Sequence, residues 1–304
     1  MNIDVSSFMQ DCTLCPRLCH ADRLNGRTGY CGQTARLTAA RAALHFWEEP
    51  CICGPNGSGT VFFSGCSLQC VFCQNHEIAV GRQGQFLSEE RLCQIFLELQ
   101  EQNAANINLV TPSHFIPQIC HALKKAREKG LSIPIVYNTS GYERVSSLKL
   151  LEGLVDIYLP DFKYFSPELG RFCAQTPDYF EWASKALQEM LRQTGPPQFD
   201  EKSGLMKRGM IVRHLVLPGQ TKDSKKILRY LHDTFGNQIY VSIMNQYTPL
   251  PHVAHIPQLN RKVTPSEYAK VVDFAEKIGI EQGYIQEGET AAESFIPSFD
   301  GQGL

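Results

Sequence analysis

Three cysteines in a C-x3-C-x2-C run, Cys66, Cys70 and Cys73, come directly after the apolar segment 60–63 and Gly65. The run brings three thiolates to one small volume and supplies no fourth. A [4Fe–4S] cluster held by three cysteines keeps one iron without a protein ligand, much as a catalytic zinc keeps one position open. Core cysteines, a disulfide and a zinc site completed by a distant residue are the alternatives, but this spacing after a strand favours the cluster.

The composition is that of a globular protein from a reducing compartment. Of the 304 residues 43% are hydrophobic and 20% are charged, and the formal net charge is −2. This balance gives no reason to expect nucleic acid or a membrane surface as a partner. We find no signal peptide and no segment of membrane-spanning length. Twelve cysteines in such a chain indicate metal ligands rather than disulfides, and we expect a cytoplasmic protein.

A second group of cysteines precedes the first run and contains four members: Cys12, Cys15, Cys19 and Cys31. Zinc and a fully ligated [4Fe–4S] cluster both accept four thiolates. Zinc sites usually contain two short cysteine pairs, whereas this group has one C-x2-C, so the spacing does not choose between the metals. Reduced thiols without a metal are the alternative. We assign no role to Cys51 and Cys53.

Strand-like and helix-like segments alternate from residue 60 onward. We expect strands over 60–63, 107–112, 133–137, 157–162, 209–217 and 238–244. We expect helices over 88–102, 116–129, 143–153, 179–193, 223–235 and 264–278. Repeated β-α units predict an α/β fold with a parallel sheet. Periodicity alone does not distinguish a partial barrel from a doubly wound sheet.

Polar residues follow four consecutive strands of this series. They are found in the segments 138–142 and 161–163, at Arg213, and in the segment 245–247. Functional residues of parallel α/β folds gather at the carboxyl ends of the strands. We therefore expect these side chains to surround one site together with the three-cysteine run.

The run Cys66-x3-Cys70-x-Phe72-Cys73 matches the pattern of the radical S-adenosylmethionine (radical SAM) superfamily. The wider chain resembles the pyruvate formate-lyase activating enzyme-like (PflX-like) branch. Segment 138–141 resembles the D-T-N-G motif of that branch, 161–163 resembles D-L-K, and 213–219 resembles R-x-V-V-V-P-G. The resemblance implies a partial (β/α)6 barrel and an oxidoreductase-type enzyme. Such an enzyme cleaves SAM at a [4Fe–4S] cluster and forms a 5′-deoxyadenosyl radical for hydrogen abstraction.

The resemblance also implies roles for individual residues. The catalytic set is Cys66, Cys70, Cys73 and Arg213. The set expected to bind the cofactor is Phe72, Asn75, Thr111, Ser113, Asn138, Ser140, Asp161, Lys163, Arg213 and Gln246. The G-G-E motif that holds the SAM ammonium in the activating enzymes is absent, so Thr111 and Ser113 are its expected replacements. Asn138 replaces the Asp of D-T-N-G, which is near a monovalent cation in that branch, and the histidine after the sixth strand has no counterpart.

On this basis we divide the chain into a cysteine-rich metal-binding segment (1–54), a radical SAM core (55–250) and a C-terminal helix with a mobile tail (251–304). The expected partners are an electron donor such as flavodoxin or ferredoxin, and either a glycyl-radical enzyme activated in trans or a small-molecule substrate. The alternative is a metal-binding assembly or electron-transfer iron–sulfur protein that does not cleave SAM. Asn75, Lys163 and Arg213 beside the three-cysteine run favour the enzyme.

Overall fold

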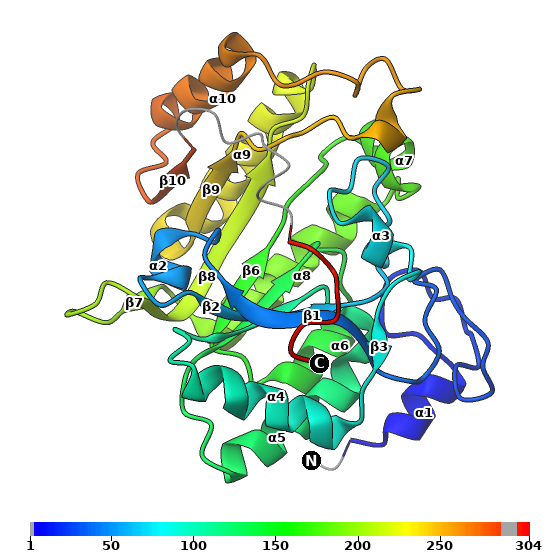
Figure 1. The fold of residues 1–304 in the computed structure, drawn as a ribbon. Coiled ribbons are helices and arrows are strands. Elements are labelled where there is room, and N and C mark those ends of the chain that lie inside the picture. The colour runs from blue at the N-terminus through cyan, green and yellow to red at the C-terminus, as the bar shows by residue number, and fades with distance from the viewer. Residues whose placement is uncertain (1–2, 287–296) are drawn as a thin grey trace.

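A single open sheet organises the structure, a computed structural model that describes residues 3–286 and 297–304 (Figure 1). Its strands are β1 (Thr38–His45), β2 (Ser58–Phe63), β3 (Gln85–Phe86), β4 (Ile107–Val110), β5 (Ile135–Thr139), β6 (Ile157–Pro160), β7 (Gln198–Phe199), β8 (Met206–Leu215), β9 (Tyr240–Met244) and β10 (Gly283–Ile285). They lie in the order β10-β9-β8-β6-β5-β4-β2-β1-β3, and β7 pairs with β8 outside this path.

The helices follow the strands in alternation. They are α1 (Val5–Gln10), α2 (Pro50–Cys53), α3 (His76–Ala79), α4 (Glu89–Glu101), α5 (Ile116–Glu128), α6 (Val145–Leu148), α7 (Pro167–Ala174), α8 (Tyr179–Thr194), α9 (Thr221–Phe235) and α10 (Pro265–Lys277). Short 3₁₀ turns are η1 (Ser113–Phe115), η2 (Lys149–Leu151), η3 (Gly236–Gln238) and η4 (Pro251–Val253). Two helices begin at side-chain caps: the Ser88 side chain accepts from the Arg91 amide, and Thr264 and Glu267 form a capping box.

The predicted strands are confirmed as β2, β4, β5, β6, β8 and β9, and each pairs in parallel with its neighbour. Their order advances in one direction without the reversal that defines a doubly wound sheet. The path also ends at two different strands, so the sheet is open. The α/β fold class and the partial barrel are therefore confirmed.

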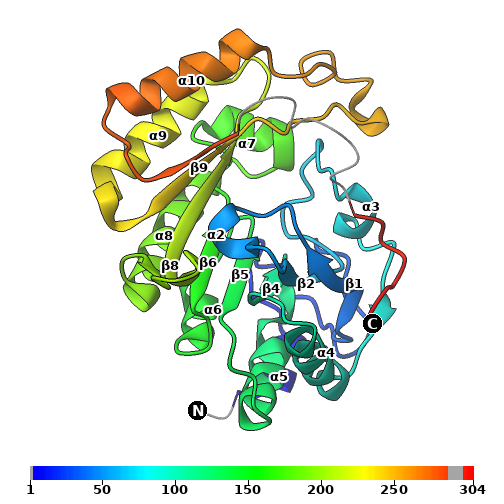
Figure 2. The same ribbon diagram turned by 60° about the vertical axis from the view of Figure 1, so that its left-hand side comes forward.

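The sheet has two unlike faces because successive side chains of a strand alternate. On β5, Ile135 and Tyr137 belong to the main apolar core, to which the helices α4, α5, α8 and α9 also contribute. Val136 faces the other way and packs with Ile52 of α2, together with Ile157 and other residues of β6 and β8. Figure 2 shows α2 on the inner side of the curved sheet, opposite the outer helices. The inner face is thus closed by α2 where the strands begin.

The N-terminal segment is joined to the sheet more closely than the sequence suggests. β1 belongs to the predicted segment 1–54, but it pairs antiparallel with β2 along its length and with β3 at its start. The predicted helix over 143–153 consists of the short α6 and η2. α7, β7 and β10 were not predicted, because each is short and has no clear hydrophobic period.

The expectation of a mobile tail is wrong for residues 297–304. Arg41 of β1 contacts Asp300 at 3.0 Å, and the Ala42 amide donates to the Gln302 carbonyl at 2.8 Å. The Phe299 ring lies against Phe62. Figure 1 shows this final segment lying across β1. The rest of the predicted tail, 287–296, lies outside the described residues.

Within residues 3–286 and 297–304, we find no helix with both the length and the apolar character needed to cross a membrane.

Candidate active site

Polar residues occupy the inner face of the sheet towards the carboxyl ends of its strands. Asp161 is two residues beyond Leu159, and Arg213 is two beyond Ile211, so both lie on the face to which α2 packs. The register places Asp161 beside Arg213 and Arg213 beside Ser242. The sequence prediction that these strand ends share one site is consistent with this register.

The three-cysteine loop follows β2 and is held by backbone contacts. The Gly65 amide donates to the Ile78 carbonyl at 2.7 Å, and the Val71 amide donates to the Cys173 carbonyl at 2.8 Å. Gly65 has φ +87°, and a Cβ there would be 2.6 Å from the Cys31 carbonyl oxygen. Only glycine fits this position, because both the backbone conformation and the close approach exclude a side chain.

Cys66, Cys70 and Cys73 lie in one loop, in which Cys70 is buried and the other two are half-buried. Burial raises the pKa of Cys70 to about 11 and that of Cys73 to about 12, and the neighbouring thiols raise the pKa of Cys73 further. The Lys163 ammonium opposes both shifts. Tyr164 Oη donates to Cys70 Sγ at 3.1 Å. Without a metal Cys70 and Cys73 keep their protons, and binding of iron would release them.

The donor set fits a [4Fe–4S] cluster with three protein ligands. Three thiols converge, and the buried Asn75 Oδ1 beside them has no hydrogen-bond partner in the described part of the chain. An unpaired buried oxygen of this kind is costly unless a ligand donates to it. Among the described residues, no three His, Cys, Asp or Glu side chains lie close enough to hold a single metal ion. The thiols of a cubane bind different irons and need not be so close.

The ends of β5 and β6 are tied together beside this loop. Tyr179 Oη donates to the carbonyls of Ser140 (2.8 Å) and Asp161 (3.0 Å), and it accepts from the Lys163 amide at 2.9 Å. Lys163 Nζ lies 2.5 Å from Asp161 Oδ2. Burial lowers the pKa of Lys163, but the Asp161 carboxylate and the Cys70 thiol outweigh it and leave the pKa raised. Lys163 is therefore a buried cation between a carboxylate and the thiols.

A carboxylate not predicted from the sequence lies behind Ser113. Ser113 Oγ and Thr139 Oγ1 donate to Glu143 Oε1 in short hydrogen bonds, and Tyr137 Oη is 3.3 Å from the same oxygen. Glu143 Oε2 is buried and has no partner among the described residues. Thr111, the other expected replacement for the missing G-G-E motif, has φ +56° and donates its amide to the Asn138 carbonyl. Glu143 therefore supplies a carboxylate in the region where the glutamate of the G-G-E motif is missing.

Glu143 is expected to make the folded protein less stable at high pH. Burial raises the pKa of Glu143 to about 7, above its ordinary value of about 4.3. Ionising this buried carboxyl group lowers the free energy of unfolding. The loss is absent below the pKa of Glu143 in the unfolded chain and is complete above its pKa in the folded protein. Glu143→Gln removes this cost, so the variant should gain stability relative to wild type as pH rises from 4.5 to 8, by about 3 kcal/mol.

Denaturant unfolding at both pH values, on protein without added SAM, measures this difference. The change in the free energy of unfolding between the two pH values is compared, rather than its absolute value. The new amide group of the variant adds a cost that does not depend on pH. Glu98→Gln changes an exposed carboxylate that pairs with Arg91 and serves as the matched control. Equal pH dependence in wild type and Glu143→Gln would contradict the assignment.

Arg213 is paired with two glutamates that precede α2. Its guanidinium donates to Glu49 Oε1 at 2.9 Å and to Glu48 in a short contact, and the Glu48 and Glu49 side chains are each 6% exposed. Asn108 Nδ2 donates to Glu48 Oε1 at 2.9 Å. The sequence predicts that Arg213 binds the SAM carboxylate, but these glutamates already neutralise its charge. The residues predicted for the site from the sequence include neither glutamate, because both come from a segment more than 150 residues away.

The remaining predicted residues lie around this centre. Phe72 is buried and packs edge-on against Tyr164 and Tyr247. The Gln246 side-chain oxygen accepts from Gln286 at 3.1 Å, which directs it towards β10. Asn138 is half-buried on β5. These positions support Phe72 as a packing residue beside the thiol loop and leave Gln246 engaged with the chain itself.

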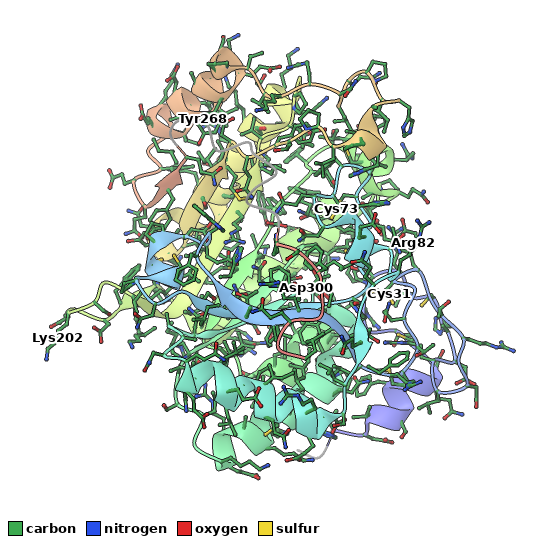
Figure 3. The ribbon with its side chains drawn as sticks, in the orientation of Figure 1. Cys31, Cys73, Arg82, Lys202, Tyr268 and Asp300 are labelled. Atoms are coloured by element: carbon green, nitrogen blue, oxygen red, sulfur yellow. The ribbon has the colours of Figure 1, made fainter. Side chains whose placement is uncertain are left out.

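The second cysteine group lies next to the first. Cys12, Cys15 and Cys31 are buried and Cys19 is exposed. Figure 3 shows Cys31 below Cys73, on the side of the molecule that carries α3. Cys51 and Cys53 belong to α2 and are buried there. The structure therefore separates the cysteines that close the inner face from those beside the three-cysteine loop.

Comparisons with known proteins show which family this chain is similar to. The family profile described as "Radical SAM superfamily" matches residues 60–231. "Uncharacterized protein MJ0674" of Methanocaldococcus jannaschii is 27% identical over 286 residues, which cover 91% of this chain and 78% of that one.

Two solved structures are more distant. Streptococcus suis SuiB bound to precursor peptide SuiA has a TM-score of 0.49 and 11% identity, over 73% of this chain and 46% of that chain. A domain of pyruvate-formate lyase-activating enzyme from Bacteroides vulgatus has a TM-score of 0.39 and 11% identity, over 57% of this chain and 91% of that chain. The present chain thus spans about half the length of SuiB.

Proposed function

Because this chain belongs to the radical SAM superfamily, we propose that Cys66, Cys70 and Cys73 hold a [4Fe–4S] cluster at which it cleaves SAM reductively. When bound, the cluster supplies one electron to SAM, which breaks the S–C5′ bond and gives methionine and a 5′-deoxyadenosyl radical. The observation that carries the proposal is the three-cysteine loop at the carboxyl end of β2, in which Cys70 is buried, Cys66 and Cys73 are half-buried, and the buried Asn75 oxygen has no partner among the described residues.

The residues around the loop suit the charged ends of SAM. We assign the SAM ammonium to Ser113 and Glu143. Glu143 Oε1 accepts hydrogen bonds from neighbouring hydroxyls, and its Oε2 has no partner among the described residues. An ammonium there would stabilise the ionised carboxylate, so binding would release a proton from Glu143 at neutral pH. We assign the SAM carboxylate to Lys163, whose charge is shared with Asp161. We also assign Thr111, Asn138 and Ser140, at the ends of β4 and β5, to the part of the site that binds SAM.

The charge of Lys163 has a second use. Its ammonium lowers the pKa of the neighbouring thiols Cys70 and Cys73, against the larger effect of burial. A fixed cation here favours the thiolate forms that iron requires. Tyr164, which donates to Cys70 Sγ, would also stabilise a thiolate and tune the electron affinity of the group bound to it.

We propose a hydrogen atom as the species abstracted, from a backbone glycine of a partner enzyme. The support is the likeness of segments 138–141, 161–163 and 213–219 to motifs of the glycyl-radical activating enzymes. We find no glycyl-radical loop of its own in the sequence, so the target would be in trans. A small-molecule substrate is the other outcome of the test below.

The proposed surroundings are a reducing compartment and a one-electron donor such as flavodoxin or ferredoxin. All twelve cysteines are free of disulfides in the structure. Free thiols in this number are typical of cytoplasmic proteins. The donor is needed because each SAM cleavage consumes one electron that the chain itself does not generate.

Anaerobic reconstitution followed by reduction with dithionite tests the proposal. We expect 5′-deoxyadenosine and methionine in equal amounts, and a change in the electron paramagnetic resonance (EPR) spectrum on addition of SAM. If SAM does not change the EPR spectrum of the cluster and no 5′-deoxyadenosine forms, the electron-transfer alternative is supported. For the substrate, a candidate glycyl-radical enzyme labelled with deuterated glycine should pass deuterium to 5′-deoxyadenosine. If SAM is cleaved but no deuterium reaches 5′-deoxyadenosine from the labelled enzyme, a small-molecule substrate is favoured.

A further inference from the structure

We propose that Cys12, Cys15, Cys19 and Cys31 bind a second [4Fe–4S] cluster and that the buried guanidinium of Arg23 is its counter-charge. This inference goes beyond SAM cleavage and does not depend on it. It rests on how the four thiols are gathered, on an uncompensated buried cation among them, and on their position against the first cysteine loop.

The fold brings the four thiols together from two turns. The Cys12 amide donates to the Ala21 carbonyl at 3.2 Å, so the chain between them doubles back. Leu18 and His20, on either side of Cys19, both have positive φ, at 44° and 51°. Such conformations are strained for residues other than glycine and persist where the surroundings require them. Cys19 is exposed, and its Sγ donates to the Cys12 carbonyl at 3.8 Å.

The second turn carries Cys31 to the same place. A Cβ on Gly29 would lie 2.3 Å from Cys19 Sγ, so only glycine allows the two turns to meet. The Leu18 amide donates to the Cys15 carbonyl at 3.1 Å, and the Gly32 amide donates to the Gly29 carbonyl at 3.0 Å. Cys15 and Cys31 therefore belong to the same two turns that meet at Gly29, and the turns bring the four cysteines into one part of the fold.

Arg23 is the observation that points to an anionic ligand. Its side chain is 1% exposed and donates to the carbonyls of Thr34 (2.8 Å) and His114 (2.6 Å), and to Cys12 Sγ at 3.7 Å. No carboxylate pairs with it in the described ranges 3–286 and 297–304. A guanidinium remains charged in proteins, and a buried charge is costly when neutral carbonyls accept its hydrogen bonds but no opposite charge neutralises it. Four thiolates around iron supply the missing negative charge.

The spacing of the thiols favours a cluster over zinc. Zinc holds sulfur at about 2.3 Å, so its four thiolates would lie roughly 3.8 Å apart. In the part of the chain that the structure describes, no three potential ligands meet the requirement for a single ion. The loop of Cys66, Cys70 and Cys73, proposed above to hold a cubane, gives the same result. A cubane places each cysteine on a different iron and accepts this wider spacing.

The segment that carries the four thiols is fastened to the active site. Arg17 Nε donates to the Ser67 carbonyl at 2.8 Å, and Gln69 Nε2 donates to the Tyr30 carbonyl at 2.5 Å. Ser147 Oγ, beyond β5, donates to the Leu14 carbonyl at 2.7 Å. Metal binding at the four thiols would therefore order the backbone on which the first cysteine loop rests.

Iron and sulfide counts on a chain that lacks the first loop test the inference. In Cys66→Ala/Cys70→Ala/Cys73→Ala, anaerobic reconstitution should leave about four irons and four sulfides per chain. Reduction should give an EPR signal that SAM does not change. Adding Cys12→Ala and Cys31→Ala should reduce iron to background, whereas adding Cys93→Ala and Cys120→Ala, both buried cysteines of α4 and α5, should not.

If the chain without the first loop fails to fold, the reverse variant gives the same information. Cys12→Ala/Cys31→Ala with the first loop intact should hold about half of the wild-type iron. Arg23→Met tests the counter-charge: in reconstituted protein, half of the second-site iron should be lost at a roughly tenfold lower chelator concentration.

Three results would overturn the inference. The first is one zinc per chain in place of iron, and the second is an iron content in the triple variant no higher than after Cys12→Ala and Cys31→Ala are added to it. The third is unchanged chelator resistance in Arg23→Met. Absence of SAM cleavage while the second-site iron is retained would instead count against the proposed function. The two failures are thus distinguishable.

Discussion

Alanine at Cys66, Cys70 or Cys73 is expected to abolish 5′-deoxyadenosine formation. Two remaining thiolates cannot hold a cubane in position, and no other cysteine of the loop replaces the third. The product should fall below detection under dithionite, and the SAM-dependent change in the EPR spectrum should disappear. The fold should persist, because removing one small buried thiol costs about 1 kcal/mol or little more.

Cys93→Ala and Cys120→Ala are the matched controls for this prediction. Both cysteines are fully buried in helices of the outer layer, so they report the general cost of losing a core thiol. They should cleave SAM at the wild-type rate. Persistent cleavage in any of the three loop variants would remove that cysteine from the proposed ligand set.

The features predicted correctly from the sequence depend on local pattern. Short apolar runs such as 107–110 and 135–137 identify buried parallel strands, because burial on both faces makes such strands almost continuously hydrophobic. The three-cysteine run is likewise local, since its spacing alone brings the thiols to one loop. The parallel arrangement then places Ser140, Asp161 and Lys163 at one edge of the sheet.

The partners of these residues could not be predicted in the same way. Glu143 looks like an ordinary first residue of a helix, and its three hydroxyl partners come from η1 and β5. Glu48 looks like part of a packing segment after β1. Its entry into the site depends on α2 folding back across the inner face, which leaves no periodic signal. An odd polar residue inside an apolar strand, such as Asn108, is the one available hint.

Arg23 illustrates a limit of a different kind. In the sequence it is one arginine in a glycine-rich stretch, with no pattern to indicate that it is buried. Its importance appears only when its contacts are known and none is a carboxylate. The C-terminal residues 297–304 resemble a tail in the sequence, because their contacts with β1, the Ala42–Gln302 backbone hydrogen bond and the Arg41–Asp300 ion pair, leave no periodic pattern.

Arg213→Ala is expected to destabilise the folded protein by about 3–5 kcal/mol, the usual cost of breaking a buried ion pair from one side. It leaves Glu48 and Glu49 buried without their cation. Although burial alone would raise the pKa of Glu49, the Arg213 guanidinium holds it below its ordinary value. This loss is a large part of the 5–15 kcal/mol that stabilises a typical domain.

The expected loss depends on pH in a defined direction. With Arg213 present, ionised Glu49 stabilises the fold above its unfolded pKa of about 4.3, and this contribution is lost as pH falls through the lower folded value. Without Arg213, burial raises the pKa of Glu49, so the variant regains stability as Glu49 is protonated. The difference between wild type and Arg213→Ala should therefore be largest above pH 6 and shrink below pH 4.5, measured by denaturant unfolding.

Removing the carboxylates as well separates charge from packing. Arg213→Met/Glu48→Gln/Glu49→Gln should recover most of the stability, since neutral side chains of similar size fill the same space. Arg213→Lys should recover part of it, because an ammonium cannot donate to both glutamates in the planar arrangement of a guanidinium. If Arg213→Ala is as stable as wild type but cleaves SAM far more slowly, then Arg213 acts on SAM directly, as its sequence resemblance alone suggests, and its pairing with the glutamates is not its main role.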